Sequence, residues 1–219
     1  DLRITRLHVH TGQMIPESLD FKLKYLLTIA ELFPNVETID FGGGLFHFYV
    51  DRSLARETLK RLENHVKKWE IQNNRSIHFR FEPGGALLAG CGYLCTTVYS
   101  VTYHEFFNKR IATVDSSAWN LAPWHRPEVI TLSNPIKEED SHIETLIAGN
   151  TLYEGDFFGR DSKGNKKSFQ LGSLEVGERL LFSGSGAYTM TNARRFNRLP
   201  LPQEYALMND ELINISQGG

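Results

Sequence analysis

The sequence predicts an α/β unit followed by a β-rich domain. In its first part, short apolar runs alternate with stretches of helical periodicity, which is typical of parallel strands covered by helices. Beyond Pro83 only short strand-like runs remain, separated by Gly, Asn, Asp and Lys. The chain has 219 residues, of which 41% are hydrophobic, enough to build a sizeable core. We expect two domains, 1–85 and 86–219.

The first domain is expected to begin with a strand, because polar and apolar residues alternate up to a loop at Thr11-Gly12-Gln13. Pro16 suits the first turn of a helix, and three consecutive glycines interrupt a later apolar run. The expected elements are a strand over 3–10, a helix from Pro16 that ends before Pro34, a strand over 36–41, a helix from Leu54 to Trp69, and a strand over 77–82.

The second domain is expected to consist of strands, with room for a long helix only at its C-terminal end. Segment 159–168 is polar and predicts an exposed hairpin or loop, and we interpret its lysines as solvated surface. The expected strands lie within 96–106, 110–115, 143–149 and 178–186.

Composition excludes several classes of partner. Lys and Arg number 24 against 26 acidic residues, so nothing favours nucleic acid or an anionic membrane. No apolar run reaches the roughly 20 residues of a membrane helix, and the N-terminus does not resemble a signal peptide, so we expect a cytoplasmic protein. The two cysteines, Cys91 and Cys95, form neither a disulfide framework nor a zinc site by themselves, and we expect both to be buried.

Two histidines, His8 and His10, fall on one face of the first expected strand. They could bind a metal, stack on the ring of an organic cofactor, or simply pack. Gly42, Gly43 and Gly44 follow the second strand, where bare backbone amides could hold an anion or merely form a turn.

Glu82 and Tyr188 are the remaining candidates. Glu82 ends the third strand, where its carboxylate could serve chemistry or form a structural salt bridge. Tyr188 follows a Gly/Ser-rich turn, where its hydroxyl could meet a phosphate or a substrate, or its ring could be ordinary filler.

Six motifs in order give these residues a common context. The chain carries HVHTG, IDFGGGL, FEPGGALLAGCGYLCTTV, VDSSAWNLAP, AGNTLYEGD and LLFSGSGAYTMT…FNR. This set, from residue 6 to about residue 205, resembles the fold-type III pyridoxal-phosphate (PLP) decarboxylases, the diaminopimelate and ornithine decarboxylase group. The resemblance implies that 1–85 is the C-terminal part of an alanine-racemase-like (β/α)8 barrel and that 86–219 is a β-barrel- or sandwich-like domain. It also implies PLP as cofactor, an amino-acid substrate, a homodimer and lyase activity.

The resemblance assigns roles to the candidate residues and requires no metal. His10 is similar to the histidine that stacks on the cofactor, with His8 supporting it or packing. Gly42, Gly43 and Gly44 match the phosphate-binding glycines, and Glu82 matches the glutamate that pairs with the pyridine nitrogen. Tyr188 corresponds to a site tyrosine near the phosphate, which we list as catalytic.

Several positions depart from the family pattern, and these departures concern the catalytic lysine and the substrate side of the site. No lysine here has the context of the Schiff-base lysine, so we expect this lysine and the remaining barrel strands to lie outside the chain. Gly85 replaces an arginine, Leu152 replaces a catalytic cysteine, and Gln13 replaces a serine. We expect Leu152 and residues 119–125 to line the substrate end. Either substrate specificity has diverged or catalysis is lost, and the substrate stays open.

Two alternatives remain. In one, the chain is a catalytically inactive regulatory or binding protein that uses the decarboxylase dimer surface. In the other, HVH is the metal pair of an amidohydrolase, for which His47 and His78 are the further ligand candidates near strand ends.

Overall fold

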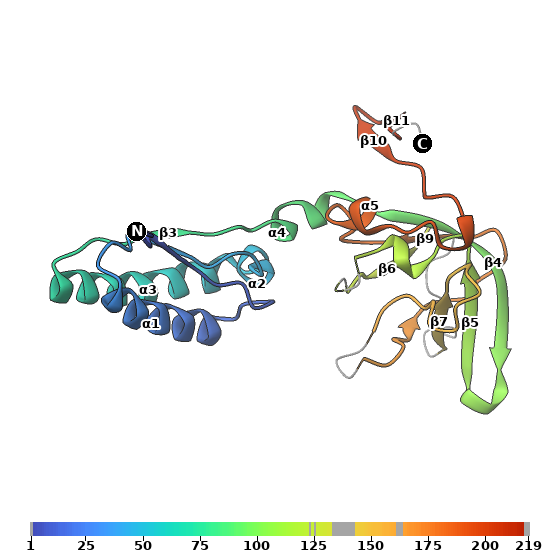
Figure 1. The fold of residues 1–219 in the computed structure, drawn as a ribbon. Coiled ribbons are helices and arrows are strands. Elements are labelled where there is room, and N and C mark those ends of the chain that lie inside the picture. The colour runs from blue at the N-terminus through green and yellow to red at the C-terminus, as the bar shows by residue number, and fades with distance from the viewer. Residues whose placement is uncertain (1, 123, 125, 133–142, 161–163, 217–219) are drawn as a thin grey trace. The chain divides into compact units, whose positions relative to one another are not determined.

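The computed structural model describes residues 2–122, 124, 126–132, 143–160 and 164–216. The chain forms two compact units, Asp1–Leu88 and Ala89–Gly219 (Figure 1). The units divide at Leu88, whereas the sequence suggested a boundary after residue 85. The predicted fold class is confirmed, since helices and parallel strands make up the first unit and a larger sheet dominates the second.

A three-stranded parallel sheet forms the centre of the first unit. Its strands are β1 (Arg6–His8), β2 (Thr38–Asp40) and β3 (His78–Arg80), in the order β1-β2-β3. They are shorter than the predicted runs, because only the middle of each run is paired. Since the strands are parallel, the loops that follow them lie at the same edge of the sheet.

Two long helices, α1 (Pro16–Leu32) and α3 (Arg52–Asn73), correspond to the predicted helices. The short helices α2 (Phe46–Val50) and α4 (Gly85–Leu88) were not predicted, since a single turn leaves no periodicity to detect. None of the described helices has both the length and the apolar character needed to cross a bilayer. The predicted apolar stripe of α1 is buried: Leu19, Leu23, Leu26, Leu27 and Ala30.

The core of the first unit joins both helices to the sheet. Phe41, directly after β2, stacks on Phe79 and Phe81, with ring centroids 5.9 and 5.4 Å away. The indole N–H of Trp69 on α3 donates to a carboxylate oxygen of Glu31 on α1 at 3.0 Å.

One side of this core stays open, as expected for part of a barrel. A groove of about 250 Å³ lies between α3 and β3, and its apolar walls include Leu59, Leu62, Val66, Phe79 and Phe81. Leu59 is 49% exposed. Within the described residues, β1 and β3 each pair with one strand only, so both edges of the sheet are unpaired.

The second unit contains a six-stranded sheet in the order β6-β9-β4-β5-β7-β8. All pairs are antiparallel except β5 with β7. Val98, Val114, Leu180 and Phe182 are fully buried in its core. The strands are β4 (Leu94–His104), β5 (Lys109–Val114), β6 (Val129–Thr131), β7 (Glu144–Ala148), β8 (Phe169–Gln170) and β9 (Arg179–Phe182). Short helical turns are η1 (Ala89–Cys91), η2 (Glu105–Phe107), η3 (Ala118–Asn120), α5 (Thr189–Asn192) and η5 (Phe196–Arg198).

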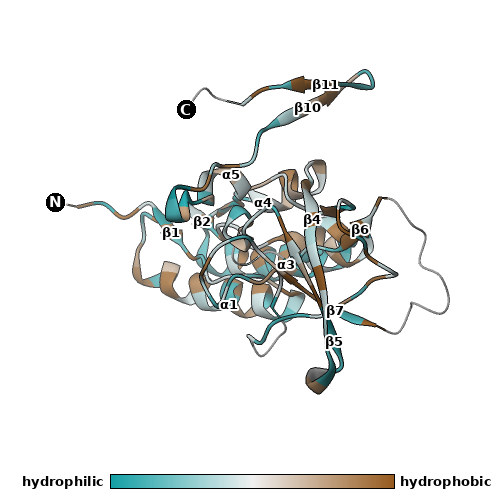
Figure 2. Cartoon of the chain, turned by 90° about the vertical axis from the view of Figure 1, so that its right-hand side faces the viewer, coloured by the Kyte–Doolittle hydropathy of each residue, from teal (hydrophilic) through white to brown (hydrophobic). Residues whose placement is uncertain are grey.

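The C-terminal end forms a hairpin, not the helix for which the sequence left room. Strands β10 (Tyr205–Met208) and β11 (Glu211–Asn214) pair antiparallel. The turn residues Asn209 and Asp210 both have positive φ, 51° and 65°, and such two-residue turns match the twist of a hairpin. Both strands carry hydrophobic colour in Figure 2, and Leu207 and Leu212 are about 70% exposed.

The predicted burial of the cysteines is wrong. Cys91 lies in η1 and Cys95 in β4, and both are exposed. Along β4 the buried residues are Leu94, Thr96 and Val98, so the alternation of the strand turns Cys95 to the outer face. Partial burial still raises the pKa of the Cys95 thiol.

The polar segment 159–168 is hairpin-like where it is described, with a bridge between Arg160 and Lys166; residues 161–163 lie outside the described residues. Lys166 is exposed, as expected, and Lys167 is half-buried, and both ammonium groups lie near aromatic rings. The ammonium of Lys166 lies 3.8 Å from the Phe157 ring centroid, and that of Lys167 lies 5.0 Å from the Phe169 centroid.

Candidate active site

His10 lies just beyond β1, on the loop at the carboxyl edge of the sheet. Its Nδ1 accepts a hydrogen bond from the backbone N–H of Gly43 at 2.9 Å. Nδ1 therefore carries no proton in this bond, and the ring is held in one orientation. Because His10 remains exposed, the imidazole offers a surface to another molecule.

The three glycines after β2 are needed for steric reasons. A Cβ on Gly42 would lie 2.7 Å from the imidazole Nδ1 of His10, and one on Gly43 would lie 2.9 Å from the carbonyl oxygen of Glu82. A Cβ on Gly44 would come within 2.0 Å of the carbonyl oxygen of Gly12. The absent side chains let the backbone approach His10 and the neighbouring loops closely.

Only part of the glycine loop has amides free for an anion. The N–H of Gly42 donates to Asp40 Oδ1 at 3.0 Å, and that of Gly43 donates to His10. Within the described residues, the N–H groups of Gly44 and Leu45 have no acceptor. The sequence treated the three glycines alike, whereas in the structure Gly42 and Gly43 organise the loop and Gly44 and Leu45 supply the free donors.

Glu82 follows β3 and reaches the same edge. Its backbone N–H donates to the Gly42 carbonyl at 2.7 Å, which ties the third loop to the second. Its side chain is exposed, and among the described residues the carboxylate has neither a hydrogen bond nor an ion pair. The alternative of a structural salt bridge therefore finds no support within this part of the chain.

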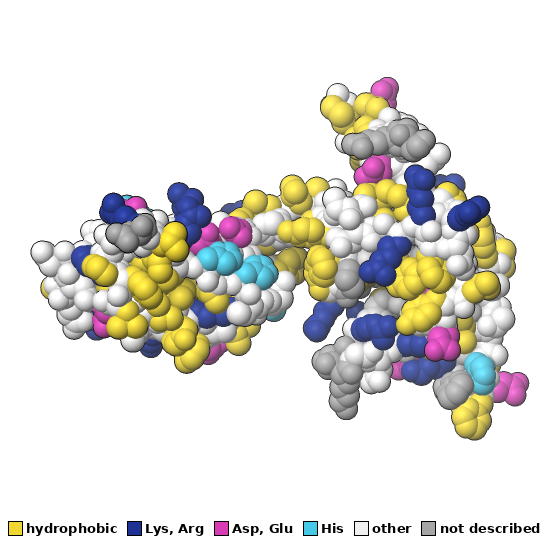
Figure 3. Space-filling view, viewed as in Figure 1, with side chains coloured by type: hydrophobic (Ala, Val, Ile, Leu, Met, Phe, Trp, Pro, Cys, Tyr) yellow, Lys and Arg dark blue, Asp and Glu magenta, His cyan; other side chains and the backbone are white. Residues whose placement is uncertain are grey.

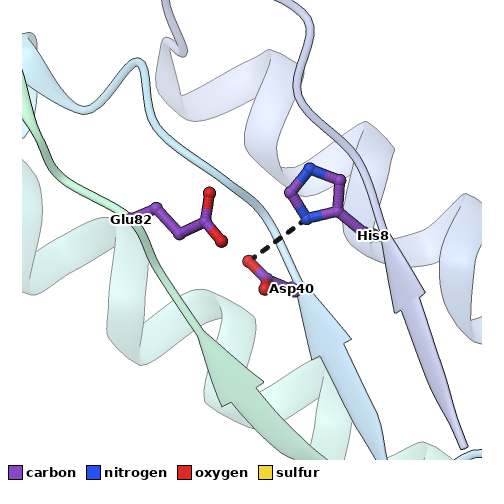
Figure 4. A group of neighbouring side chains, drawn as sticks. All are labelled: His8, Asp40 and Glu82. Atoms are coloured by element: carbon purple, nitrogen blue, oxygen red, sulfur yellow. Dashed lines mark ion pairs between the residues drawn. The ribbon is translucent and has the colours of Figure 1, made fainter.

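Asp40 is the site residue that the sequence analysis missed. His8, Asp40 and Glu82 come from three adjacent strands and point toward one another (Figure 4), and their ligand atoms lie within 4.8 Å of one another. His8 Nδ1 lies 3.5 Å from Asp40 Oδ1. Histidine and acidic side chains also lie side by side on the face of the first unit seen in Figure 3. An ionisable residue inside an apolar strand run, directly before a glycine loop, was the available signal.

Asp40 is ionised although it is only 2% exposed. Burial is the largest influence and acts to raise the pKa of its carboxyl group. The hydrogen bond from Gly42 and the nearby His8 and Arg6 together outweigh it, so the pKa lies below its ordinary value.

Among the described residues, the two histidines of HVH do not come together in one group of possible metal ligands. His8 faces Asp40, while His10 Nδ1 is occupied by the Gly43 amide. His78 is the first residue of β3, at the opposite end from the glycine loop, and His47 lies within α2. The group that could hold a cation is His8 with Asp40 and Glu82.

Tyr188 belongs to the second unit and has an unusual backbone. Its φ of 61° is in the left-handed region, and it directly precedes α5. The side chain is 46% exposed, and its ring packs edge-on against Trp124 at 5.5 Å. The ring thus rests against Trp124 while the side chain remains about half exposed.

The residues expected at the substrate end also lie in the second unit. Leu152 is 93% exposed. Its neighbour Tyr153 lies against the Trp119 ring, with centroids 5.3 Å apart. Of the expected stretch 119–125, residues 123 and 125 lie outside the described residues.

Comparison with known proteins places this geometry in context. No family model matches the chain. The chain is 26% identical to the diaminopimelate decarboxylase of Buchnera aphidicola subsp. Acyrthosiphon pisum over 233 residues, which cover 98% of this chain and 54% of that protein. It is 24% identical to diaminopimelate decarboxylase of Escherichia coli K12, over 96% of this chain and 52% of that protein.

Solved structures agree with the sequence relatives. A crystal structure of diaminopimelate decarboxylase superposes with a TM-score of 0.78 at 23% identity, over 97% of this chain and 53% of that one. Carboxynorspermidine decarboxylase from Campylobacter jejuni gives a TM-score of 0.69 at 22% identity, over 99% of this chain and 59% of that one. The chain is thus similar in sequence to diaminopimelate decarboxylases and similar in fold to diaminopimelate and carboxynorspermidine decarboxylases. It spans about half the length of the curated relatives it matches.

Proposed function

We propose that this chain is part of a PLP-dependent amino-acid decarboxylase of the diaminopimelate and ornithine decarboxylase type, with divergent substrate specificity. The observation that carries the proposal is the convergence of His10, the glycine loop and Glu82 at one edge of the parallel sheet. The set consists of an oriented imidazole, and of backbone amides and a carboxylate that have no partner among the described residues. Such a set suits a phosphorylated aromatic cation.

The residues fit the cofactor that the relatives imply. Glu82 can accept the hydrogen bond of a protonated pyridine nitrogen, and the exposed imidazole of His10 can stack on a ring. The amides of Gly44 and Leu45, which have no acceptor among the described residues, can donate to a phosphate. The family resemblance, not the geometry, adds the Tyr188 hydroxyl as a further candidate donor. When bound, PLP supplies a ring that accepts electrons as CO2 leaves the amino acid.

The other residues of the sheet edge hold this set in place. Asp40 accepts the Gly42 amide and lies beside His8, so it fixes the start of the glycine loop. Gly43 in turn orients the His10 ring. The buried, hydrogen-bonded carboxylate of Asp40 therefore helps to keep the glycine loop and the His10 ring in one geometry.

The substrate side is the divergent part. Leucine has no proton to donate, so Leu152 cannot perform the acid step of a cysteine at that position. Gly85 cannot replace the charge of an arginine. These two replacements support a second candidate function, a decarboxylase-like protein that binds a ligand or partner without catalysis.

The proposal requires partners for this chain. We propose that the lysine that carries the cofactor and the remaining barrel strands are supplied from outside these residues, and that the assembled protein is a homodimer. The apolar groove beside β3 and the unpaired sheet edges support a covering partner for the first unit.

A PLP titration of the chain tests the cofactor site directly. We expect saturable binding at one equivalent, followed by absorbance, and about tenfold weaker binding for Glu82→Gln, because a charge-assisted hydrogen bond is lost. His10→Ala is expected to weaken binding similarly. His47→Ala is the matched control, since His47 is exposed on α2. Equal affinity in all variants would contradict the proposed site.

Catalysis is tested with the lysine-bearing part of the protein present. Release of CO2 from one of a panel of amino acids identifies the substrate, whereas cofactor binding without CO2 release favours the binding protein. Stoichiometric zinc that is lost in Asp40→Asn would favour the hydrolase alternative, because Asp40 is one of the three convergent ligand residues.

A further inference from the structure

The second unit contains a cavity whose lining includes Trp119, Leu121 and Ala122, from the stretch that the sequence analysis expected at the substrate end. Its volume is about 210 Å³, and none of the proposed cofactor residues lines it. Three segments distant in sequence form its walls: η3 with the residues that follow it, residues 155–160, and the end of α5.

The polar part of the wall is positively charged. Arg160 and Arg194 both line the cavity, and none of the described lining residues is acidic. Arg160 donates to the Gly164 carbonyl through one nitrogen at 2.9 Å, which leaves most of its donors free. Within the described part of the chain, neither arginine forms an ion pair. Two guanidinium groups that have no ion-pair partner among the described residues, both beside one cavity, favour an anion.

Aromatic rings shape the apolar part of the wall and hold Arg194 in place. The guanidinium carbon of Arg194 lies 5.4 Å from the centroid of the Trp119 ring. Trp119 is itself held by Phe196, edge-on at 4.5 Å, and by Tyr153. A guanidinium over an aromatic face keeps its N–H edge available for a bidentate contact.

Two further cavity residues, Phe157 and Asn192, have contacts that bear on ligand binding. Phe157 lines the cavity and carries the Lys166 ammonium 3.8 Å above its ring, which adds positive charge nearby. Asn192 uses its amide nitrogen to donate to the Tyr188 carbonyl at 2.8 Å, so its side-chain oxygen is the atom left for a ligand. Figure 3 shows basic and hydrophobic side chains next to one another on a face of this unit.

We propose that this cavity binds a small organic carboxylate, with the carboxylate on Arg194 and Arg160 and the hydrocarbon against Trp119 and Phe157. The cavity is smaller than the roughly 300–1,000 Å³ of pockets for drug-sized ligands, so the ligand is a short acid. The aromatic wall favours an organic acid over inorganic phosphate, because phosphate cannot use the apolar surface. This site contains none of the proposed cofactor residues, and it adds to the proposed function an acid-binding site at the stretch expected to face the substrate.

Glutarate is the probe for the test, with the chain labelled for amide NMR. The indole N–H signal of Trp119 is assigned by its loss in Trp119→Phe. We expect glutarate to shift this signal. We expect Arg194→Met to weaken glutarate binding at least tenfold. Arg195→Met is the matched control, because this neighbouring arginine is exposed and does not line the cavity. Arg160→Met provides a second variant if Arg194→Met does not fold, and the same loss is expected.

The outcomes separate the alternatives. Equal glutarate affinity in Arg194→Met and Arg195→Met would contradict the proposed site. So would the absence of a saturable shift of the Trp119 indole N–H signal. Inorganic phosphate that binds more tightly than glutarate overturns the assignment to an organic acid. Since the titration contains no cofactor, failure of the PLP site leaves this result unaffected.

Discussion

At the scale of single residues, Asp40 combines a buried position with a charge. Its lowered pKa means that ionised Asp40 stabilises the fold above the ordinary value of 3.8, and that this contribution is lost as pH falls through the lower pKa of the folded state. We expect Asp40→Asn to reduce the free energy of unfolding by about 1 kcal/mol at pH 7, and by less as pH falls below 3.8. Urea unfolding of both proteins from pH 7 to pH 3 measures this; a gap that widens in acid would contradict it.

Gly44 is the glycine of the loop with the least room. Its φ is +82°, and an added Cβ would lie 2.0 Å from the backbone oxygen of Gly12. We expect Gly44→Ala to lower the free energy of unfolding by more than about 2 kcal/mol, because backbone strain and a backbone clash add together. Gly12→Ala is the control: its φ is also positive, +75°, but nothing lies within 4 Å, so a cost of about 1 kcal/mol is expected. Equal losses in the two variants would show that the clash is relieved at no cost.

Site residues could be predicted from the sequence where the residue type, at the end of a strand, has only a few possible roles. A triple glycine, a strand-end glutamate and a histidine after a strand are visible as patterns, and the structure brings His10, Gly43 and Glu82 together. Asp40 was missed although its place inside an apolar run was a signal, because its role depends on contacts with His8 and the Gly42 amide that only the structure shows. The exposed Cys95 shows the same limit, since an apolar run does not reveal which face of the strand points outward.

At the scale of elements, the start of α3 depends on a cap that the sequence analysis did not use. The Asp51 side chain accepts a hydrogen bond from the Leu54 N–H at 2.9 Å. We expect Asp51→Ala to lower the free energy of unfolding by about 1 kcal/mol, the usual cost of losing an N-cap. Glu57→Ala, an exposed change on the same helix, is expected to be nearly neutral. Thermal unfolding of the three proteins decides, and equal melting temperatures would contradict a role for the cap.

Elements with a repeated pattern were predicted well, and single-turn elements were not. α1 and α3 extend over enough turns for apolar periodicity to show, and the long strands of the second unit alternate clearly. α2 and α4 have five and four residues, too few for a period to appear. The β10–β11 hairpin depends on two left-handed turn residues, Asn209 and Asp210, whose conformation is visible only in the structure.

At the scale of the whole molecule, the apolar side of the first unit is the feature that the rest of a barrel would cover. The groove beside β3 has apolar walls, and Leu59 is about half exposed at its edge. Small soluble domains rarely leave such a surface in water unless it has a function.

A hydrophobic fluorescent dye tests whether the apolar walls of this groove are accessible from solvent. We expect the chain alone to enhance the fluorescence of 8-anilinonaphthalene-1-sulfonate, and Leu59→Gln to reduce the enhancement by at least half, because an apolar wall of the groove is lost. Leu32→Gln is the control: Leu32 is 75% exposed on α1 but does not line the groove. Equal reductions in both variants would mean that the dye reports general surface hydrophobicity. A dye signal that disappears when the lysine-bearing part of the protein is added would show that this part covers the groove, as the proposed barrel requires.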